Sequence, residues 1–359
     1  MTGPLKLTYR ELFIQLLKDP DRKPLIKIVT EFLYLFFVYK ELPRHYFSRY
    51  LFKKEITNIR DFLPNKLLDE KIFNRFSDIK VKEVLDNKLY FYLFYRQFNI
   101  RIAKILMYNH RRMFVIGKKC IDVRSLNDFT LLLEGIFKYN PSHDSLMIKK
   151  TYSSSSGRHV YKIFRDQLKT DPEAIGKLFN EVIQTSFIFQ ETVYQHPELS
   201  KLNPSCINTI RMDTFIDEDG KSNVISAYIR MSTSNSHVDN FNEGGCAVGI
   251  VLETGKLKKY GYSSFKNVGV KVLTQHPVTR TVFENYNIPF LPQAKELVLK
   301  AARLVPMLRL IGWDVAIGES GPVLIEGNSN YQISGSDFLY GGYLANKSFR
   351  KVLNEFNNS

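Results

Sequence analysis

The fold is decided by the stretch Ile311-Gly-Trp-Asp-Val-Ala-Ile-Gly-Glu-Ser-Gly-Pro-Val-Leu-Ile-Glu-Gly-Asn328. Two apolar runs flank a short Glu-Ser-Gly turn, which is the pattern of a β-hairpin. The turn places Asp314 and Glu326 on neighbouring strands, and the period of two along a strand places Glu326 and Asn328 on one face. Two carboxylates and an amide oxygen should therefore converge, and Mg²⁺ prefers such hard oxygen ligands. The alternative is a solvated hairpin with incidental acids, although carboxylates after apolar strands are costly unless paired.

Strand signals also dominate the chain upstream of this hairpin. Apolar runs at 207–216 and 223–232 enclose the turn Asp217-Glu-Asp-Gly220, which predicts a second hairpin. A further strand is expected at 246–252 and a long helix at 292–308. These elements predict a sheet covered by at least one helix.

A lysine and a serine-rich loop form a second candidate site. The apolar run that ends at Lys149 leads into Thr-Tyr-Ser153-Ser-Ser-Ser156-Gly157-Arg, followed by another apolar run. Small residues such as Ser155, Ser156 and Gly157 let backbone amides approach phosphate oxygens, and lysine adds a point charge. The order differs from that of a Walker loop, where lysine follows the glycines and precedes a helix. A flexible serine turn is the alternative interpretation.

Two further polar groups could bind a ligand. Asn208 and Arg211 open the predicted strand at 207–216, where an arginine can act as a bidentate anion donor. His196 stands before Pro197, which is typical of a turn or helix-cap histidine. Downstream, polar residues precede paired glycines next to a strand, which favours a backbone that passes close to a ligand or a polar hairpin loop. The residues of this downstream cluster are Asp239, Asn240, Gly244 and Gly245.

The first 75 or so residues have helical spacing, and beyond about Val81 short apolar segments alternate with helical ones. Helix starts are expected at Ser125 and at Thr170-Asp-Pro-Glu173. The run Phe32-Leu-Tyr-Leu-Phe-Phe-Val-Tyr39 is interpreted as the buried face of a core helix. The alternative is an aromatic helix that lies beside basic residues on an anionic bilayer.

Composition limits the class of protein. The 359 residues are 44% hydrophobic and 24% charged, which excludes intrinsic disorder and fibrous structure. The net charge is +15, and residues 1–150 carry 29 basic and 16 acidic side chains, or +13 of it. This asymmetry indicates an anionic partner, or ordinary solvated lysine. Nucleic acid is not expected, because no nucleic-acid-binding motif accompanies the charge.

The cellular setting is expected to be the cytoplasm. Three widely spaced cysteines, Cys120, Cys206 and Cys246, form neither a disulfide framework nor a zinc cluster and fit a reducing compartment. The first residues lack the pattern of a secretory signal. The longest apolar run has eight residues, Phe32 to Tyr39, too few to cross a bilayer.

Taken in order, these segments resemble the ATP-grasp fold, and specifically the sugar-transfer-associated ATP-grasp family of bacterial surface-polysaccharide clusters. The resemblance covers about residues 80 to 340. One departure is the loop after Lys149, where this chain has Lys150 and four serines instead of proline and more glycine. The motifs that carry the resemblance are Lys149 with its serine-glycine loop, Gln190-Glu191 with Gln195-His196-Pro197, Asn208-Thr209-Ile-Arg211, Asp239-Asn240-Phe241 with Gly244-Gly245, Gly312-Trp-Asp314 and Glu326-Gly-Asn328.

The resemblance implies an α+β ATP-grasp fold in which two α+β subdomains clasp ATP, after a mainly helical N-terminal region. The boundaries expected are 1–75 for that region, 76–145 for an N-terminal α/β subdomain, 146–200 for a lid and 201–359 for the subdomain with the metal site.

The same resemblance implies roles for individual residues. Lys149, with Lys88 as a second lysine, would contact the α and β phosphates, and Gln190 and Glu191 would lie near adenine and ribose at the hinge. Asp239, Asn240, Gly244 and Gly245 would bind substrate. Asn208 would act with Arg211, which would steady the transferred phosphoryl group. Mg²⁺ ions bridging the β and γ phosphates would be held by Asp314, Glu326 and Asn328.

The reaction implied is that of a carboxylate-amine ligase, which forms an acylphosphate and releases ADP and phosphate. Its partners would be a uronic acid carboxylate of a capsule or O-antigen precursor and an amino acid or small amine, near the inner membrane face. One alternative keeps the fold for a kinase that phosphorylates a sugar or polyol hydroxyl. Another is a non-catalytic protein that binds acidic glycan or membrane. Fold is more securely implied than substrate.

Overall fold

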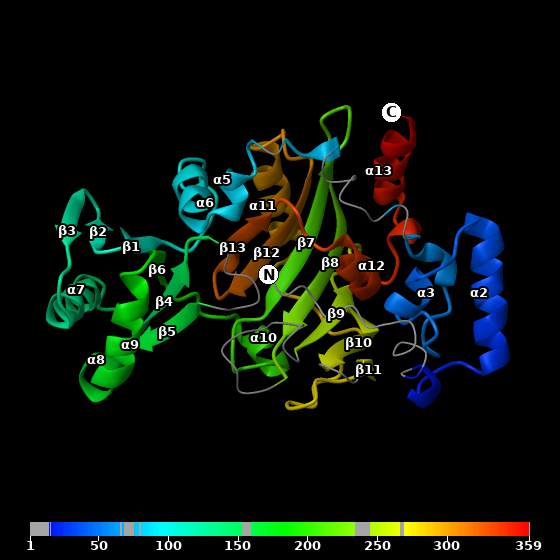
Figure 1. Cartoon of the computed structure of the whole chain (residues 1–359), viewed down its shortest axis with the longest axis horizontal. Coiled ribbons are helices and arrows are strands. Elements are labelled where there is room, and N and C mark those ends of the chain that lie inside the picture. The colour runs from blue at the N-terminus through cyan, green and yellow to red at the C-terminus, as the bar shows by residue number, and fades with distance from the viewer. Residues whose placement is uncertain are drawn as a thin grey trace.

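Two antiparallel sheets form the body of the protein, with helices on their faces (Figure 1). The computed structural model describes residues 14, 16–64, 67, 75–78, 80–152, 159–233, 245–265 and 269–358. Every pairing of neighbouring strands in both sheets is antiparallel. The mixture of separate sheets and helices confirms the expected α+β class.

The smaller sheet has six strands in the order β3-β2-β1-β6-β4-β5. Its core is made by helices α7 and α9, with short α8, packed against apolar side chains of the strands. A capping box between Ser125 and Asp128 starts α7, and Asp171 with Pro172 starts α9, which confirms both expected helix starts. The elements are β1 Ile105–His110, β2 Met113–Ile116, β3 Lys119–Asp122, α7 Leu126–Tyr139, β4 Ser145–Lys150, β5 Val160–Phe164, α8 Gln167–Thr170, α9 Pro172–Val182 and β6 Ser186–Glu191.

The larger sheet has seven strands in the order β11-β10-β9-β8-β7-β12-β13. Both hairpins expected from the sequence are present, as β7 with β8 and β12 with β13. Helices α5 and α6 lie beside β13, and α10, α12, η4 and α13 complete this part of the chain (Figure 1). The elements are α5 Glu83–Asp86, α6 Lys88–Tyr95, α10 Pro197–Leu202, β7 Thr209–Ile216, β8 Ser222–Met231, β9 Cys246–Ile250, β10 Leu257–Phe265, β11 Gly269–Leu273, α11 Leu291–Arg303, β12 Leu310–Gly318, β13 Gly321–Asn328, α12 Ile333–Tyr340, η4 Tyr343–Ala345 and α13 Lys347–Asn358.

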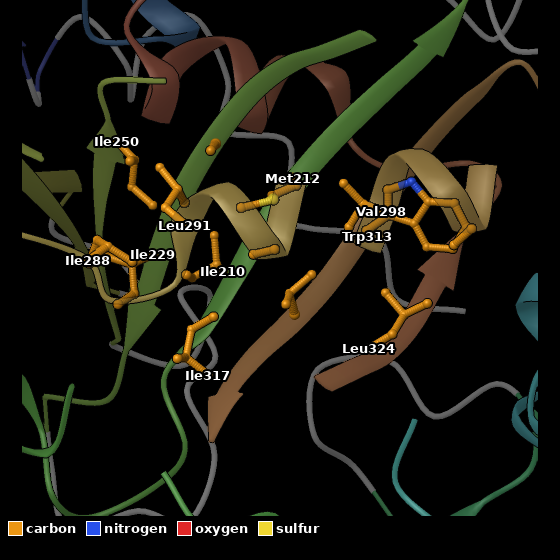
Figure 2. Packing of buried hydrophobic residues seen from close by; sticks show 14 of the residues in the cluster. Ile210, Met212, Ile229, Ile250, Ile288, Leu291, Val298, Trp313, Ile317 and Leu324 are labelled. Carbon is orange, nitrogen blue, oxygen red and sulfur yellow. The ribbon is translucent and has the colours of Figure 1, made fainter. Parts of the chain in front are cut away.

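The main core lies between the larger sheet and α11. Figure 2 shows Leu291 and Val298 of this helix beside Met212 of β7 and Trp313 of β12. These side chains are almost fully excluded from water, so their burial supplies the main driving force for folding of this part. Alternate residues of a strand point to opposite faces. The residues next to Met212 in β7 and next to Trp313 in β12 therefore face away from this core.

The chain enters and leaves the smaller sheet at adjacent points. The N–H of Lys104, just before β1, donates to the carboxylate of Glu191 at the end of β6 (2.9 Å), and the N–H of Glu191 donates to the carbonyl of Lys104 (3.0 Å). Residues 105–191 therefore form an insertion into the rest of the chain. This division differs from the boundaries that we expected, because the six-stranded sheet runs across position 145/146 and α5 and α6 pack with the larger sheet.

The N-terminal region is helical, as expected, with α2 Leu25–Tyr39, α3 His45–Ser48 and the short η1 Ile59–Asp61. It packs through Tyr46 and its neighbours on β8–β11 and α12. The interpretation of α2 as a core helix is wrong for most of its surface, because only Ile28 and Leu35 are buried. Along the described ranges, no helix combines the length and the apolar character needed to cross a membrane.

Candidate functional site

A β-bulge brings the two expected carboxylates onto one face of the larger sheet. Val315 of β12 lies opposite Leu324 of β13, but the next residue back, Asp314, lies opposite Glu326, so Ile325 is an extra residue on β13. Leu324 belongs to the core beside α11. The extra residue resets the alternation, and Glu326 joins Asp314 on the opposite face. The expected pairing of these acids on neighbouring strands is thus confirmed.

Gly327 allows this bulged strand to lie close to the core. It is opposite Trp313 in the hairpin, and a Cβ atom at Gly327 would lie 2.9 Å from Cζ3 of that indole and 3.1 Å from Cδ2 of Leu85. A Cβ atom so close would force Trp313 or Leu85 to shift, so glycine is the residue that fits between Glu326 and Asn328 without displacing the core.

Two arginines surround Asp314. Arg211, opposite it on β7, donates from Nε to Oδ1 (2.6 Å) and from Nη2 to Oδ2 (3.1 Å), a bidentate pair. Arg230 of β8 lies 2.9 Å from Oδ2. Burial alone would raise the pKa of Asp314, but the two guanidinium charges outweigh it and hold the pKa well below its ordinary value. Asp314 is therefore an anion at neutral pH although it is nearly inaccessible to solvent.

Lys88 and Asn328 contact Glu326 on the next strand. Nζ of Lys88 lies 3.2 Å from Oε2 of Glu326, and Nδ2 of Asn328 lies 3.5 Å from Oε1. The amide nitrogen of Asn328 also contacts the carbonyl of Gly312 (3.4 Å). With the nitrogen used in this way, Oδ1 of Asn328 is the atom that can serve as a ligand.

Lys88 also connects the two sheets. Its backbone N–H donates to the carbonyl of Thr151 (2.9 Å), just beyond Lys149 and Lys150 at the end of β4. The preceding turn is fixed because the hydroxyl of Ser329 contacts both carboxylate oxygens of Asp86 (2.9 and 3.0 Å). Lys88 therefore contacts both the end of β4, the strand that carries Lys149, and the carboxylate of Glu326.

Gln190 and Glu191 lie where the smaller sheet joins the rest of the chain. Gln190 is buried, and its Nε2 donates to the carbonyl of Ala103 (3.3 Å). Glu191 accepts the Lys104 N–H already described, and its other oxygen lies 3.9 Å from Nε2 of His143. The structure thus places this pair at the junction of the smaller sheet with the rest of the chain, and its role as a hinge in contact with a nucleotide stays a prediction.

Asn208 does not face the carboxylates. Its Oδ1 accepts from Asn203 (3.0 Å), and its Nδ2 donates to the carbonyl of Leu199 (2.8 Å). Its side chain is fully buried and holds the connection between α10 and β7, which favours a structural role. His196 is the N-cap of α10, accepting from the N–H of Glu198 (3.1 Å), as expected for a cap histidine.

Some of the expected site residues lie outside the described ranges. Gly245 is described and is buried immediately before β9, and its contact with a substrate stays a prediction. The residues outside the described ranges are Ser155, Ser156 and Gly157 of the serine-rich loop and Asp239, Asn240 and Gly244 of the polar cluster.

Arg230 is the residue that our sequence reasoning missed. It is in a predicted strand whose neighbours are apolar, and its guanidinium contacts Thr209 as well as Asp314. An arginine inside an apolar strand is itself a signal, because burying an unpaired charge is costly. The acid that pairs with it, however, is 84 positions away in the chain and could be found only from the fold.

The donor set at the two carboxylates fits a hard divalent cation. Mg²⁺ is commonly held by one or two carboxylates, with the remaining positions filled by water and phosphate oxygens. Asp314, Glu326 and the amide oxygen of Asn328 would provide such a set, in which Asp314 would share its two oxygens with Arg211 and Arg230. The depressed pKa of Asp314 keeps it ionised. The described ranges contain no group of three or more His, Cys, Asp or Glu side chains that could hold a metal ion, and the metal site at Asp314 and Glu326 stays a prediction.

Comparison with known proteins identifies a family. The family model described as sugar-transfer associated ATP-grasp matches residues 69–352. No curated protein sequence matches the chain.

Several solved structures are similar at low sequence identity. D-alanyl-alanine synthetase A from Vibrio cholerae is 14% identical with a TM-score of 0.41, covering 76% of this chain and 65% of its own. D-cycloserine synthetase DcsG is 11% identical with a TM-score of 0.42, covering 77% and 73%. The biotin carboxylase domain of a 2-oxoglutarate carboxylase from Hydrogenobacter thermophilus, solved with MgADP and bicarbonate, is 10% identical with a TM-score of 0.39, covering 75% and 46%. The chain spans less than two thirds of the length of the first and third of these proteins.

Proposed function

Because the chain belongs to the sugar-transfer-associated ATP-grasp family and has an α+β fold with two sheets, we propose that it is an ATP-dependent carboxylate-amine ligase. The observation that carries the proposal is the pair of carboxylates, Asp314 and Glu326, with Arg211, Arg230 and Lys88 in contact with them. Cations and acids gathered on one sheet face suit the binding of a metal-phosphate group.

The proposed reaction has two steps. A carboxylate oxygen of the first substrate attacks the γ-phosphorus of ATP, and the bond from that phosphorus to the β,γ-bridging oxygen breaks, so ADP leaves. The amine nitrogen of the second substrate then attacks the acyl carbon of the acylphosphate. Phosphate leaves with the electron pair of the broken C–O bond, and the nitrogen loses a proton. The product is an amide, and water must be excluded to protect the acylphosphate.

The proposed roles are those that the family resemblance implies. Lys88 and Lys149 bind phosphate oxygens, and Arg211, already oriented by Asp314, attracts the transferred phosphoryl group. Mg²⁺, held by Asp314, Glu326 and Asn328, supplies charge neutralisation when bound. The remaining proposed contacts are Gln190 and Glu191 with adenine and ribose, Ser155, Ser156 and Gly157 with phosphate, and Asp239, Asn240, Gly244 and Gly245 with substrate.

The substrates that we propose follow from the family's association with sugar transfer. The carboxylate is that of a uronic acid in a capsule or O-antigen precursor, and the amine is an amino acid or another small amine. The charge of +13 in residues 1–150 supports an anionic partner. The need for ATP and the three free cysteines support a cytoplasmic setting.

The test is product analysis with Mg-ATP, a uronic acid and a set of amino acids, comparing the wild type with two variants of one hairpin. Glu326→Gln removes the carboxylate charge at the site, and we expect kcat to fall by about 10²- to 10³-fold. Glu319→Gln makes the same change at an exposed position in the turn and should leave kcat unchanged. ADP release should require both the carboxylate and the amine.

Three results would overturn the ligase assignment. Formation of AMP would exclude an acylphosphate route through ADP. A stable phosphorylated sugar made without amine would identify a kinase. Failure of the wild type to bind Mg-ATP in calorimetry would favour a non-catalytic binding protein.

A further inference from the structure

Helix α2 carries an apolar face that points away from the rest of the protein. Ile26 is 82% exposed and Phe37 is 73% exposed, although isolated globular domains normally bury such side chains. At 100° per residue, six of the eight exposed large apolar residues of α2 lie within an arc of about 120°, and the other two, Tyr34 and Val38, lie outside it. The six are Leu25, Ile26, Val29, Leu33, Phe36 and Phe37.

The opposite side of the same helix is the one that packs on the protein. Ile28 and Leu35 are buried, and Phe32 and Tyr39 are partly buried against the N-terminal core. The residues of the outer face are therefore not the ones that hold the helix against the protein. In Figure 1, α2 lies at the end of the molecule opposite the six-stranded sheet. A continuous apolar face of this kind marks a docking surface.

The exposed charged side chains of the N-terminal region are mainly basic. Among the acidic residues in the described part of 14–64, Asp19 and Glu31 are paired with Lys53 and Lys23. The side chain of Asp21 is 50% exposed, and the others are partly buried. Basic side chains in the same part are exposed without a comparable number of exposed acids. The exposed basic residues are Lys18, Lys27, Lys40, Arg44, Lys54 and Arg60.

We propose that the outer face of α2 lies in the interface of an anionic lipid bilayer. An interfacial helix buries aromatic and aliphatic side chains among the acyl chains and places basic side chains at the level of the head groups. Helix α2 has the exposed apolar face, together with exposed Lys27 and, at its C-cap, exposed Lys40. The same charges disfavour a second copy as the occupant. A two-fold dimer would bring the identical faces, with their exposed basic residues, against each other.

The rest of the N-terminal region fixes this helix relative to the site. The buried guanidinium of Arg49 pairs with Asp337 of α12, which also accepts the N–H of Leu63 (3.1 Å). A bilayer bound at α2 would therefore hold the larger sheet in a defined orientation. This inference is independent of the proposed ligase reaction, because no side chain on the outer face of α2 belongs to the candidate site.

The test is co-sedimentation of the full chain with vesicles. One set contains equal amounts of phosphatidylglycerol and phosphatidylcholine, and the other contains phosphatidylcholine alone. The variant Ile26→Ser/Phe37→Ser removes two exposed apolar groups, and we expect about 30- to 100-fold weaker binding to the anionic vesicles. The matched control Tyr139→Ser/Val278→Ser removes side chains that are 86% and 60% exposed elsewhere, and it should bind like the wild type.

A second pair of variants tests the charge. Lys27→Gln/Lys40→Gln should weaken binding to anionic vesicles by about 10- to 30-fold, whereas Lys138→Gln/Lys169→Gln, on α7 and α8, should not. Equal binding to both kinds of vesicle would overturn the proposal, and so would equal binding of the wild type and the α2 variants. Dimers of the wild type in light scattering that disappear in Ile26→Ser/Phe37→Ser would show that a second copy covers the face. ATP turnover should be unchanged in these variants. A failure of the membrane proposal can therefore be told apart from a failure of the ligase proposal.

Discussion

His45 is a buried histidine without a hydrogen-bond partner on either ring nitrogen among the described residues. Its ring lies edge-on to that of Tyr39, with ring centroids 5.7 Å apart. Burial, with a smaller contribution from the charge of Arg49, lowers the pKa of His45 from 6.5 to about 4. The folded protein therefore requires the neutral imidazole.

This pKa makes stability depend on pH in one direction. Between about pH 6.5 and 4 the unfolded chain binds a proton that the folded chain does not, so stability falls as the pH falls through this window. From pH 7 to pH 5 the loss from His45 should be about 2 kcal/mol. The free energy of unfolding is measured in urea at both pH values. In His45→Phe its fall from pH 7 to pH 5 should be smaller than in the wild type by this amount. His110→Phe, at an exposed histidine, should keep it, and an equal loss in all three proteins would contradict the assignment to His45.

At the scale of elements, the bulged hairpin of β12 and β13 makes stability depend on Gly327. In Gly327→Ala the new methyl group would press on Trp313 and Leu85, so we expect a loss of about 1–3 kcal/mol in the free energy of unfolding. Gly135→Ala makes the same change in α7, where no atom lies within 4 Å of the new Cβ. That variant should gain about 0.5–1 kcal/mol, because alanine favours a helix. Shifts of the urea midpoint in the same direction for both variants would contradict this account.

The sequence predicts the elements better than their contacts. The turn Glu319-Ser-Gly321 and its apolar flanks predict the hairpin, and Pro172 after a capping aspartate predicts the start of α9. The bulge at Ile325 has no sequence signal, because either face of the strand accepts apolar residues there. The contacts of Arg211 and Arg230 with Asp314 depend on the order of β8, β7 and β12, which only the three-dimensional fold decides.

The exposure of α2 shows a second limit. An apolar helix predicts burial, but the sequence does not say whether the burying phase is protein or lipid. The same composition that indicates a core helix also suits a helix with a docking face, and the two differ only in what covers Ile26 and Phe37.

At the scale of the whole molecule, one buried ion pair joins the N-terminal region to the family's core. Arg49 and Asp337 are both inaccessible to solvent, and residue 49 precedes the part matched by the family model, which begins at 69. Arg49→Met would leave Asp337 buried without its cation, and we expect a loss of about 3–5 kcal/mol. Arg60→Met, at an exposed arginine of the same region, should change stability by no more than about 0.5 kcal/mol. Equal unfolding midpoints in urea for the two variants would contradict a joining role for the pair.

The insertion of residues 105–191 is attached by two chain crossings that lie next to each other, at Lys104 and Glu191. With two adjacent connections, residues 105–191 can rotate most easily about the line that joins the two crossings. Rotation about this line would break no hydrogen bond between strands of either sheet, but it would stretch the hydrogen bond from Lys88 to Thr151. We therefore expect the hydrogen bond at Lys88, together with that between Tyr194 and Asp144, to restrict such a rotation of residues 105–191.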